Sequence, residues 1–305
     1  MNRPRRPPYV DRVGRWCVPA LLAIAFNHAV SGQEAASAFS QGREQFRLRD
    51  FTGAATSFER AVAADPKNSK YHQWLGRALG FQSGQKGIAS SLGAIGKVRG
   101  ELEQAIALDP NNLEARVDLI VFYQAVPGIL GGSRAKANEQ LAEVKARDPS
   151  LGAQTEGDML GLEKKYPEAE RCYLKAIRAN PSRPMPHVRL ALVQQQNKQW
   201  DLAFASLQRA LAIDPRLPLA IYQVGRTGAL SGERLDLAEQ SLKRYLQLKP
   251  DLENPSPSAA HFRLGNIYQK KGDLAAARSE YTTALNLDPK NKEAREALLT
   301  LRRPD

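Results

Sequence analysis

Three of the four histidines occupy one recurring sequence slot, and imidazole side chains are common metal ligands. His72, His187 and His261 each precede a leucine by three residues. A zinc site needs three or four ligands gathered around one ion. Because the slot recurs in widely separated segments, it favours a packing role in a repeated element. We therefore expect no metal site.

The glycine-rich segment 128–134 could bind an anion through its backbone N–H groups. It lacks the Gly-Lys-Ser/Thr ending of a phosphate-binding loop, and no predicted strand precedes it. The segment therefore predicts a wide turn between two helices, with an anion-binding nest as the alternative.

Residues that could support covalent or acid–base catalysis lack the necessary neighbours. Cys172 stands beside Tyr173 with no nearby histidine. Carboxylate pairs such as Glu168/Glu170 lie among lysines and arginines, as on a solvated helix face. We predict no enzymatic activity, no cofactor and no small-molecule substrate.

The composition suits a soluble helical protein with a basic surface. The chain has 305 residues, of which 42% are hydrophobic and only 7% aromatic. Its 44 Lys and Arg outnumber 32 Asp and Glu, which gives a formal net charge of +12. A basic surface favours acidic partners without identifying one.

The elements that must position these residues are clearest between residues 260 and 289. Leu264 and Tyr268 belong to one apolar stripe at helical spacing, and Leu274 and Tyr281 belong to a second. Gly272 lies between them, and glycine commonly ends a helix in the left-handed conformation. The pattern predicts two short antiparallel helices that close against each other.

This stretch resembles the tetratricopeptide repeat (TPR) family. The resemblance rests on the spacing of Leu264, Gly265, Tyr268, Ala277, Tyr281, Ala284 and Pro289. Prolines with similar surroundings recur along the chain at intervals of 32 to 44 residues, and the family period is about 34. The resemblance implies an all-α, right-handed superhelical solenoid of about seven helix pairs.

The predicted domain organisation follows from these recurrences. Residues 1–32 form a signal peptide and residues 33–305 the solenoid, which ends in a capping helix at 292–303. The predicted units span about 35–68, 69–112, 113–151, 152–183, 184–217, 218–252 and 258–291. The second unit carries about ten extra residues within 80–100, where four glycines favour a loop or short extra helical turns.

The N-terminal residues resemble an export signal. Five arginines precede or flank an apolar run at 16–26, and small residues follow through Gly32. The run is shorter than the about 20 residues of a membrane-spanning helix. We predict export to the periplasm or the outside of a bacterial cell, with cleavage near Gln33. A chain anchored by residues 16–26 is the alternative.

The family resemblance implies that first helices line a concave groove. The residues at inward offsets carry arginine, amide and aromatic side chains, with Asp158 the main acidic exception. The predicted peptide-groove residues are Phe39, Arg43, Phe46, Gln73, Arg77, Val188, Gln195, Tyr222, Arg226, Phe262, Asn266 and Gln269. Val121 and Leu192 share the inward offset of Asn266.

These offsets predict a non-catalytic adaptor or scaffold that binds a protein or peptide segment, with acidic segments favoured by the arginines. The lysine and asparagine set that holds a C-terminal carboxylate in some family members is absent, since only Asn266 matches it. Two alternatives stay open. One is a polyanion or nucleic acid on the basic surface, which we disfavour, and the other is a scaffold that binds through its convex face.

Overall fold

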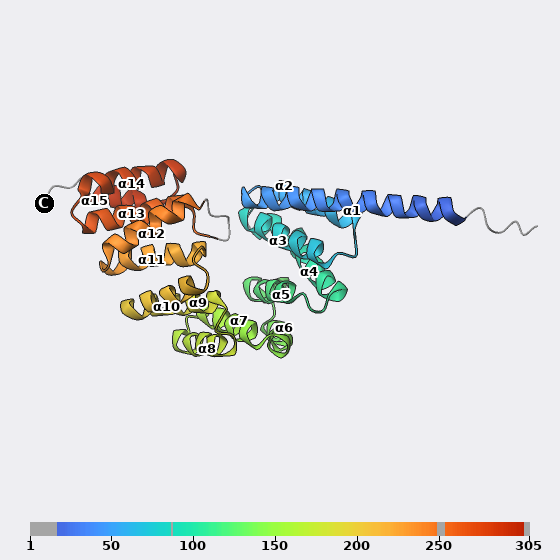
Figure 1. Cartoon of the computed structure of the whole chain (residues 1–305), viewed down its shortest axis with the longest axis horizontal. Coiled ribbons are helices and arrows are strands. Elements are labelled where there is room, and N and C mark those ends of the chain that lie inside the picture. Colours follow the sequence, from blue (N-terminus) through green and yellow to red (C-terminus); the bar gives the residue numbers. More distant parts are fainter. Residues whose placement is uncertain (1–16, 87, 249–253, 302–305) are drawn as a thin grey trace, which may run out of the picture. The chain divides into compact units, whose positions relative to one another are not determined.

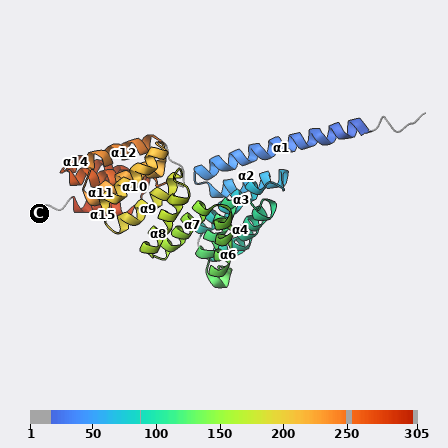
Figure 2. The same ribbon diagram turned by 60° about the horizontal axis from the view of Figure 1, so that its bottom comes forward.

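A computed structural model describes residues 17–86, 88–248 and 254–301, which form fifteen α-helices and one short 3-10 helix (Figure 1). No strand occurs within these residues. The all-α solenoid expected from the sequence is confirmed. Figure 2 shows the same helix pairs from a second direction.

The helices divide between two compact units. The N-terminal unit comprises the described residues up to Phe46 together with Asp50–Pro110, and the C-terminal unit comprises Arg47–Arg49 and the described residues from Asn111. The N-terminal unit holds α1 (Cys17–Arg47), α2 (Phe51–Ala64), α3 (Ser69–Lys86) and α4 (Ile88–Leu108). The C-terminal unit holds α5 (Leu113–Ala125), η1 (Gly128–Leu130), α6 (Arg134–Arg147), α7 (Pro149–Leu162), α8 (Tyr166–Ala179), α9 (Pro184–Gln196), α10 (Trp200–Ile213), α11 (Pro218–Ser231), α12 (Leu235–Gln247), α13 (Pro257–Lys270), α14 (Leu274–Leu287) and α15 (Lys292–Thr300).

Short polar residues and prolines set where many of these helices begin. The Asp273 carboxylate accepts a hydrogen bond from the Ala276 amide at 2.9 Å, and Asp148 does the same for Leu151 at 2.8 Å. Such caps satisfy amides that have no partner inside the helix. Pro218 and Pro257 open α11 and α13, where proline has the required φ and needs no N–H donor.

Left-handed residues close several first helices, as the sequence predicts for Gly272. That glycine has a φ of 83°, and Gly232 has a φ of 85° after α11. Lys164 and Lys198 take the same conformation at the corresponding turns. The turn geometry is therefore shared, although glycine supplies it in only some repeats.

The extra residues within 80–100 lengthen two helices, so of the two expected forms the structure has extra helical turns rather than a loop. α3 and α4 have 18 and 21 residues, against 13 or 14 in each helix from α5 to α14. Only residue 87 between them lies outside the described part. Gly84, Gly93 and Gly96 lie inside these helices, at a cost in helix propensity, whereas Gly87 is outside the described residues.

The glycine-rich segment is a wide turn, and several of its N–H groups bond to backbone carbonyls. The amides of Gly131, Gly132 and Ser133 bond to the carbonyls of Gly128, Pro127 and Tyr123. Ser133 also caps α6 through its hydroxyl. These bonded amides are not the free donors that the alternative, an anion nest, requires. The turn presents Ile129, which is 94% exposed.

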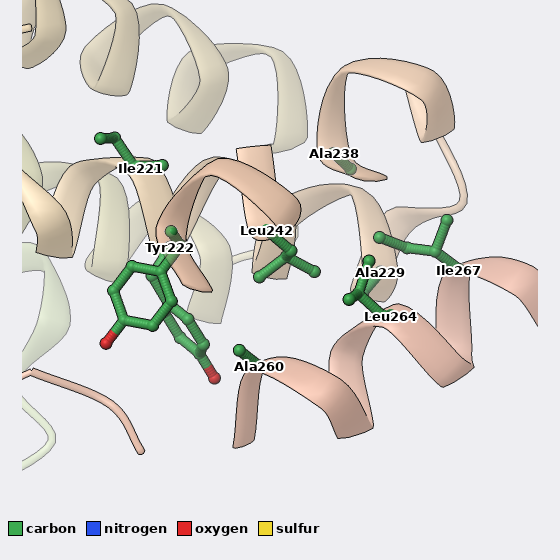
Figure 3. Close-up of a cluster of buried hydrophobic side chains, with 9 residues drawn as sticks. Ile221, Tyr222, Ala229, Ala238, Leu242, Ala260, Leu264 and Ile267 are labelled. Atoms are coloured by element: carbon green, nitrogen blue, oxygen red, sulfur yellow. The ribbon is translucent and has the colours of Figure 1, made fainter. Parts of the chain in front are cut away.

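The core forms where second helices insert large side chains between first helices. Figure 3 shows Leu242 of α12 between Tyr222 of α11 and Leu264 of α13. Tyr245, also from α12, lies 5.2 Å from the Tyr222 ring, centroid to centroid. Small buried residues such as Ala238 and Ala260 allow the helices to approach closely. Each pair therefore depends on its neighbours for burial.

The two ends of the predicted solenoid differ in detail from the expectation. α15 packs on α14 as a terminal helix, but it ends at Thr300 rather than 303, and residues beyond 301 lie outside the described part. α13 begins at Pro257, one residue before the predicted start of the seventh unit. α1 begins at Cys17 and runs through the predicted cleavage site before Gln33, so signal removal stays a prediction.

Candidate functional site

One residue from each successive first helix of the C-terminal unit lines the candidate site. These residues, which we call the inner row, are Val121, Asp158, Leu192, Arg226 and Asn266. The first helices α7, α9, α11 and α13 contact one another in succession. Consecutive repeats therefore bring their inner-row side chains onto one surface.

Four inner-row residues share a single open cavity of about 460 Å³. It is lined by Val121, Asp158, Gly161, Leu162, Tyr166, Tyr173, Arg189, Leu192, Val193, Gln196 and Arg226. Apolar walls with a few convergent polar groups are typical of a binding pocket. The cavity thus combines contributions from α5, α7, α8, α9 and α11.

An ion pair and a tyrosine organise one side of the cavity. Arg189 Nε lies 3.3 Å from Asp158 Oδ1, and the Tyr173 hydroxyl donates a hydrogen bond to the same oxygen at 2.9 Å. Burial raises the pKa of the Asp158 carboxyl, although Arg189 and the Tyr173 hydrogen bond oppose that shift. Both side chains of the ion pair remain 36% exposed and accessible to a ligand.

A neutral amide holds the arginine on the other side. Arg226 Nη1 donates a hydrogen bond to Gln195 Oε1. The Nε2 atom of the same amide group donates to Thr227 Oγ1 at 2.8 Å. Burial lowers the pKa of Arg226, and the nearby charge of Arg263 adds to the shift. The guanidinium is thus fixed in position without a carboxylate partner among the described residues.

In several helix pairs, the type of the inner-row residue depends on whether the second helix places a tyrosine beside it. Tyr173 reaches Asp158, and Tyr281 lies 2.7 Å from the Asn266 side-chain oxygen. Where Leu242 replaces the tyrosine, the inner-row residue is Arg226. The same holds in the N-terminal unit, where Phe58 and Leu102 accompany Arg43 and Arg77. A tyrosine hydroxyl from the second helix therefore accompanies an inner-row residue that can accept its hydrogen bond.

Asn266 borders a second, smaller cavity of about 330 Å³. Ala229, Gln269 and Lys270 complete its lining. The Tyr281 hydroxyl lies within hydrogen-bond distance of both Asn266 and Gln269, at 2.7 and 2.8 Å. Burial raises the pKa of Tyr281 to about 12, so the hydroxyl stays protonated and orients these amides.

The N-terminal unit carries its own cluster of cations on aromatic rings. The guanidinium carbons of Arg43 and Arg77 lie 4.2 and 5.1 Å from the centre of the Trp74 ring. Phe39 and Phe46 pack edge-on against the same ring. Stacking holds the guanidinium planes in place and leaves their N–H edges to other partners.

The structure separates the predicted groove residues into two groups. Those at the central offset, and a few beside it, are exposed or half-buried: Phe39, Arg43, Arg77, Arg226, Phe262, Asn266 and Gln269. Those at flanking offsets are buried: Phe46, Gln73, Val188, Gln195 and Tyr222. The second group packs against neighbouring helices, which keeps its side chains from direct contact with a ligand in this conformation.

Sequence reasoning missed much of the cavity wall. Arg189, which lines the larger cavity, stands one residue before the leucine of its first helix, an offset that the predicted set omits. Tyr166 and Tyr173 come from a second helix. The available signal was the pairing of tyrosine with an inward acceptor in the same repeat.

The three histidines take packing roles in this structure. His72 Nδ1 lies 2.6 Å from Glu101, and His261 Nδ1 lies 2.6 Å from Glu280. His187 has no such acid, and burial lowers its pKa, helped by the charge of Arg209. Among the residues that the structure describes, no group of histidine, cysteine and acidic side chains could hold a metal ion. Within the same part of the chain, no helix is both long and apolar enough to cross a bilayer.

Comparisons with known proteins explain the recurring pairs. A tetratricopeptide repeat family model matches residues 258–291, and a second such model matches 39–79 and 163–218. The chain is a tetratricopeptide repeat protein. The matched segments of this TPR protein include α13 with α14 and α8 with α9 and α10. The family predicted from the sequence is therefore confirmed.

One curated relative and several solved structures are similar to this TPR protein. Cellulose synthase operon protein C from Pseudomonas fluorescens is 31% identical over 135 residues, which cover 43% of this chain but 10% of that much longer protein. PilF from Pseudomonas aeruginosa has a TM-score of 0.52 at 19% identity, with 76% of this chain and 97% of that chain covered. Human IFIT1, solved as a dimer with PPP-AAAA, has a TM-score of 0.59 at 18% identity, with 82% and 58% covered. At these identities the structures show a shared fold.

Proposed function

We propose that this TPR protein is a non-catalytic scaffold that binds an extended segment of another protein along the inner row of its C-terminal unit. One observation carries the proposal. Side chains from four consecutive first helices line a single cavity that mixes apolar walls with charged groups. An extended peptide can contact several repeats at once, and its side chains enter such pockets.

The chemistry of the cavity favours a peptide over other ligands. Leu192 and the tyrosine rings offer apolar contact, while Arg226 and the Asp158–Arg189 pair offer charged hydrogen bonds. TPR folds commonly serve as interaction scaffolds. The arginines outnumber the acid, so the segment bound here is more acidic than basic.

A photo-crosslinking amino acid at Leu192 tests the proposal in the full chain. Leu202 provides the control position, because it is 51% exposed on the second helix α10. A partner that crosslinks at 192, and is lost when Arg226→Ala is added, supports binding at the inner row. A partner that crosslinks only at 202 contradicts it and favours the convex-face scaffold.

A polyanion remains the second candidate because of the cations on aromatic rings in the N-terminal unit. Arg43 and Arg77 lie on Trp74, and Lys70 Nζ lies 5.8 Å from the Phe39 ring centre. Single-stranded nucleic acid needs exposed ring faces for stacking, but Trp74 is only 7% exposed. Binding of a single-stranded oligonucleotide that falls steeply with salt would favour this candidate.

We also propose that the protein acts outside the cytoplasm. The arginines and the short apolar run before Gly32 support export. Mass spectrometry of the protein from its native host should find the N-terminus near Gln33. A cytosolic chain that begins at Met1 contradicts the proposal, and a membrane-bound chain that keeps residues 16–26 indicates the anchored alternative.

A further inference from the structure

Two arginines on neighbouring first helices lack acidic partners within the described residues. Arg226 of α11 donates to the neutral Gln195 amide, and Arg263 of α13 lies with its guanidinium carbon 4.9 Å from the Phe262 ring centre. Within residues 111–248 and 254–301, neither forms an ion pair with a carboxylate. Two other arginines of this unit do form ion pairs, Arg189 with Asp158 and Arg234 with Asp201.

The Arg263 side chain also has an unused donor. Its Nε is buried and has no hydrogen-bond partner in this structure. A buried donor without a partner is destabilising, because it has lost its hydrogen bond to water and gained none in the protein. An oxyanion placed between the two guanidinium groups could accept hydrogen bonds from both residues and relieve their mutual repulsion.

The like charges are close enough to affect each other. The charge of Arg263 lowers the pKa of Arg226, in addition to the larger effect of burial. α11 and α13 pack directly against each other. Two half-buried cations on adjacent helices, each with neutral partners only, form an incomplete arrangement that one anion would complete.

The spacing of the helices fixes the distance between Arg226 and the nearest apolar residue of the inner row. Leu192 of α9 lies on the helix before Arg226 and lines the same cavity. Axes of packed helices lie about 8–10 Å apart, and an extended peptide advances about 3.3 Å per residue. One step along the inner row therefore corresponds to about three residues of an extended ligand.

We propose that the bound segment places an acidic side chain against Arg226 and Arg263, and an apolar side chain about three residues away against Leu192. This inference rests on the proposed function, whose binding surface it specifies. It commits to a peptide carboxylate as the anion. A basic residue at the acidic position would face two cations and is excluded.

A peptide array probed with the full chain tests both the charge and the spacing. Each peptide carries one Glu and one Leu, separated by one to five positions in either order, with random uncharged flanks. Matched peptides replace Glu by Gln or by Lys. We expect retention to peak at a separation of about three residues, and the Gln peptides to bind about tenfold more weakly.

Paired variants assign the effect to these two arginines. Arg226→Gln with Arg263→Gln should remove the preference for Glu over Gln, while the preference for Leu remains. Arg171→Gln with Arg278→Gln removes the same charge from exposed positions on α8 and α14 and should change nothing. Arg226→Glu should select the Lys peptides instead. Thermal unfolding of each variant checks that it is folded.

The outcomes separate this inference from the proposed function. Retention that depends on Leu192 but not on the acidic residue or its spacing overturns the inference and leaves the peptide-binding proposal standing. Failure of the wild-type chain to retain any peptide overturns both. Equal loss of binding in the Arg171/Arg278 control shows general charge attraction and also overturns the inference.

Discussion

Glycines in two regions of the molecule occupy opposite surroundings. In the C-terminal unit, a Cβ added at Gly225 would lie 2.2 Å from Leu242 Cγ, and one at Gly265 would lie 2.4 Å from the Tyr281 ring. In α4 of the N-terminal unit, a Cβ at Gly93 or Gly96 would meet nothing within 4 Å. Glycine is thus required for close packing of the helices in the C-terminal unit. At Gly93 and Gly96 of α4, no close contact requires it.

The difference shows what holds each region in its helical form. At Gly225 and Gly265 the large side chain of the second helix fills the space that the glycine leaves, so tertiary packing offsets the low helix propensity of glycine. At Gly93 and Gly96 of α4 no neighbouring side chain fills that space. We therefore expect local opening there at lower free energy than in the C-terminal pairs.

The largest expected effect comes from filling a packed glycine. Gly225→Ala places a methyl group against Leu242 and should lower the free energy of unfolding by about 1–3 kcal/mol. Denaturant unfolding followed by circular dichroism measures it. Adding Leu242→Ala should give a double variant that is less destabilised than the sum of the two single variants. Full additivity would contradict the close contact.

The reverse effect is expected in α4. Gly93→Ala with Gly96→Ala should raise the free energy of unfolding by about 1–2 kcal/mol in total, since alanine favours the helix and finds open space. Hydrogen exchange of the α4 amides should slow in parallel. Destabilisation by these substitutions would show that the face is packed, and the contrast between the regions would fail.

A smaller effect tests the tyrosines that cover the packed glycines. Tyr281→Phe keeps the ring over Gly265 but removes the hydroxyl that lies near Asn266 and Gln269. The loss should be about 1 kcal/mol in unfolding free energy. Tyr281→Leu imitates the Gly225–Leu242 pair and should cost more, because the ring volume is lost. A Tyr281→Phe variant as stable as wild type would show that the hydroxyl contributes nothing to stability.

The smallest effect distinguishes two inner-row residues that follow packed glycines. Asp158→Asn makes the fourth repeat resemble the seventh, where Asn266 stands. The folded-state pKa of Asp158 is raised above 3.8, so its folded form binds protons more readily than its unfolded form. Stability from this group is therefore greatest below 3.8 and falls as pH rises through the raised pKa.

The variant should consequently be more stable than wild type at neutral pH by a few tenths of a kcal/mol, because exposure limits the effect. The gain should disappear as the pH falls toward 3.8. Thermal unfolding at a series of pH values measures it. A gain that is independent of pH would assign the effect to something other than the carboxyl charge.

The repeat pattern predicted most of the fold because its signals are local. Leu264 and Tyr281 mark two helices within one short segment, and Pro289 marks the end of the second. Gly272 was predictable as a left-handed residue because glycine adopts positive φ without steric cost. The α3–α4 extension was harder to predict. Its glycines left a loop and extra helical turns equally open, because only the packing of α3 on α4 favours the longer helices.

The candidate site was only partly predictable because it depends on how helices rotate against each other. At the central offset, Arg226 and Asn266 line the two cavities. At the flanking offsets, Tyr222 and Gln195 are buried, and the Gln195 amide bonds to Thr227 of the next first helix. The Asp158–Arg189 pair joins α7 to α9, and no pattern within one repeat encodes that meeting. Ligand binding by the remaining residues stays a prediction.

The inner row has one further consequence, for how this protein can change over evolutionary time. In several repeats the inner-row residue directly follows the packed glycine, as Asp158 follows Gly157 and Arg226 follows Gly225. The glycine faces the second helix while its successor faces the open cavity. Mutation can therefore alter ligand preference at one codon while the adjacent codon preserves the scaffold. Duplicated repeats could diverge in what they recognise without passing through an unfolded ancestor.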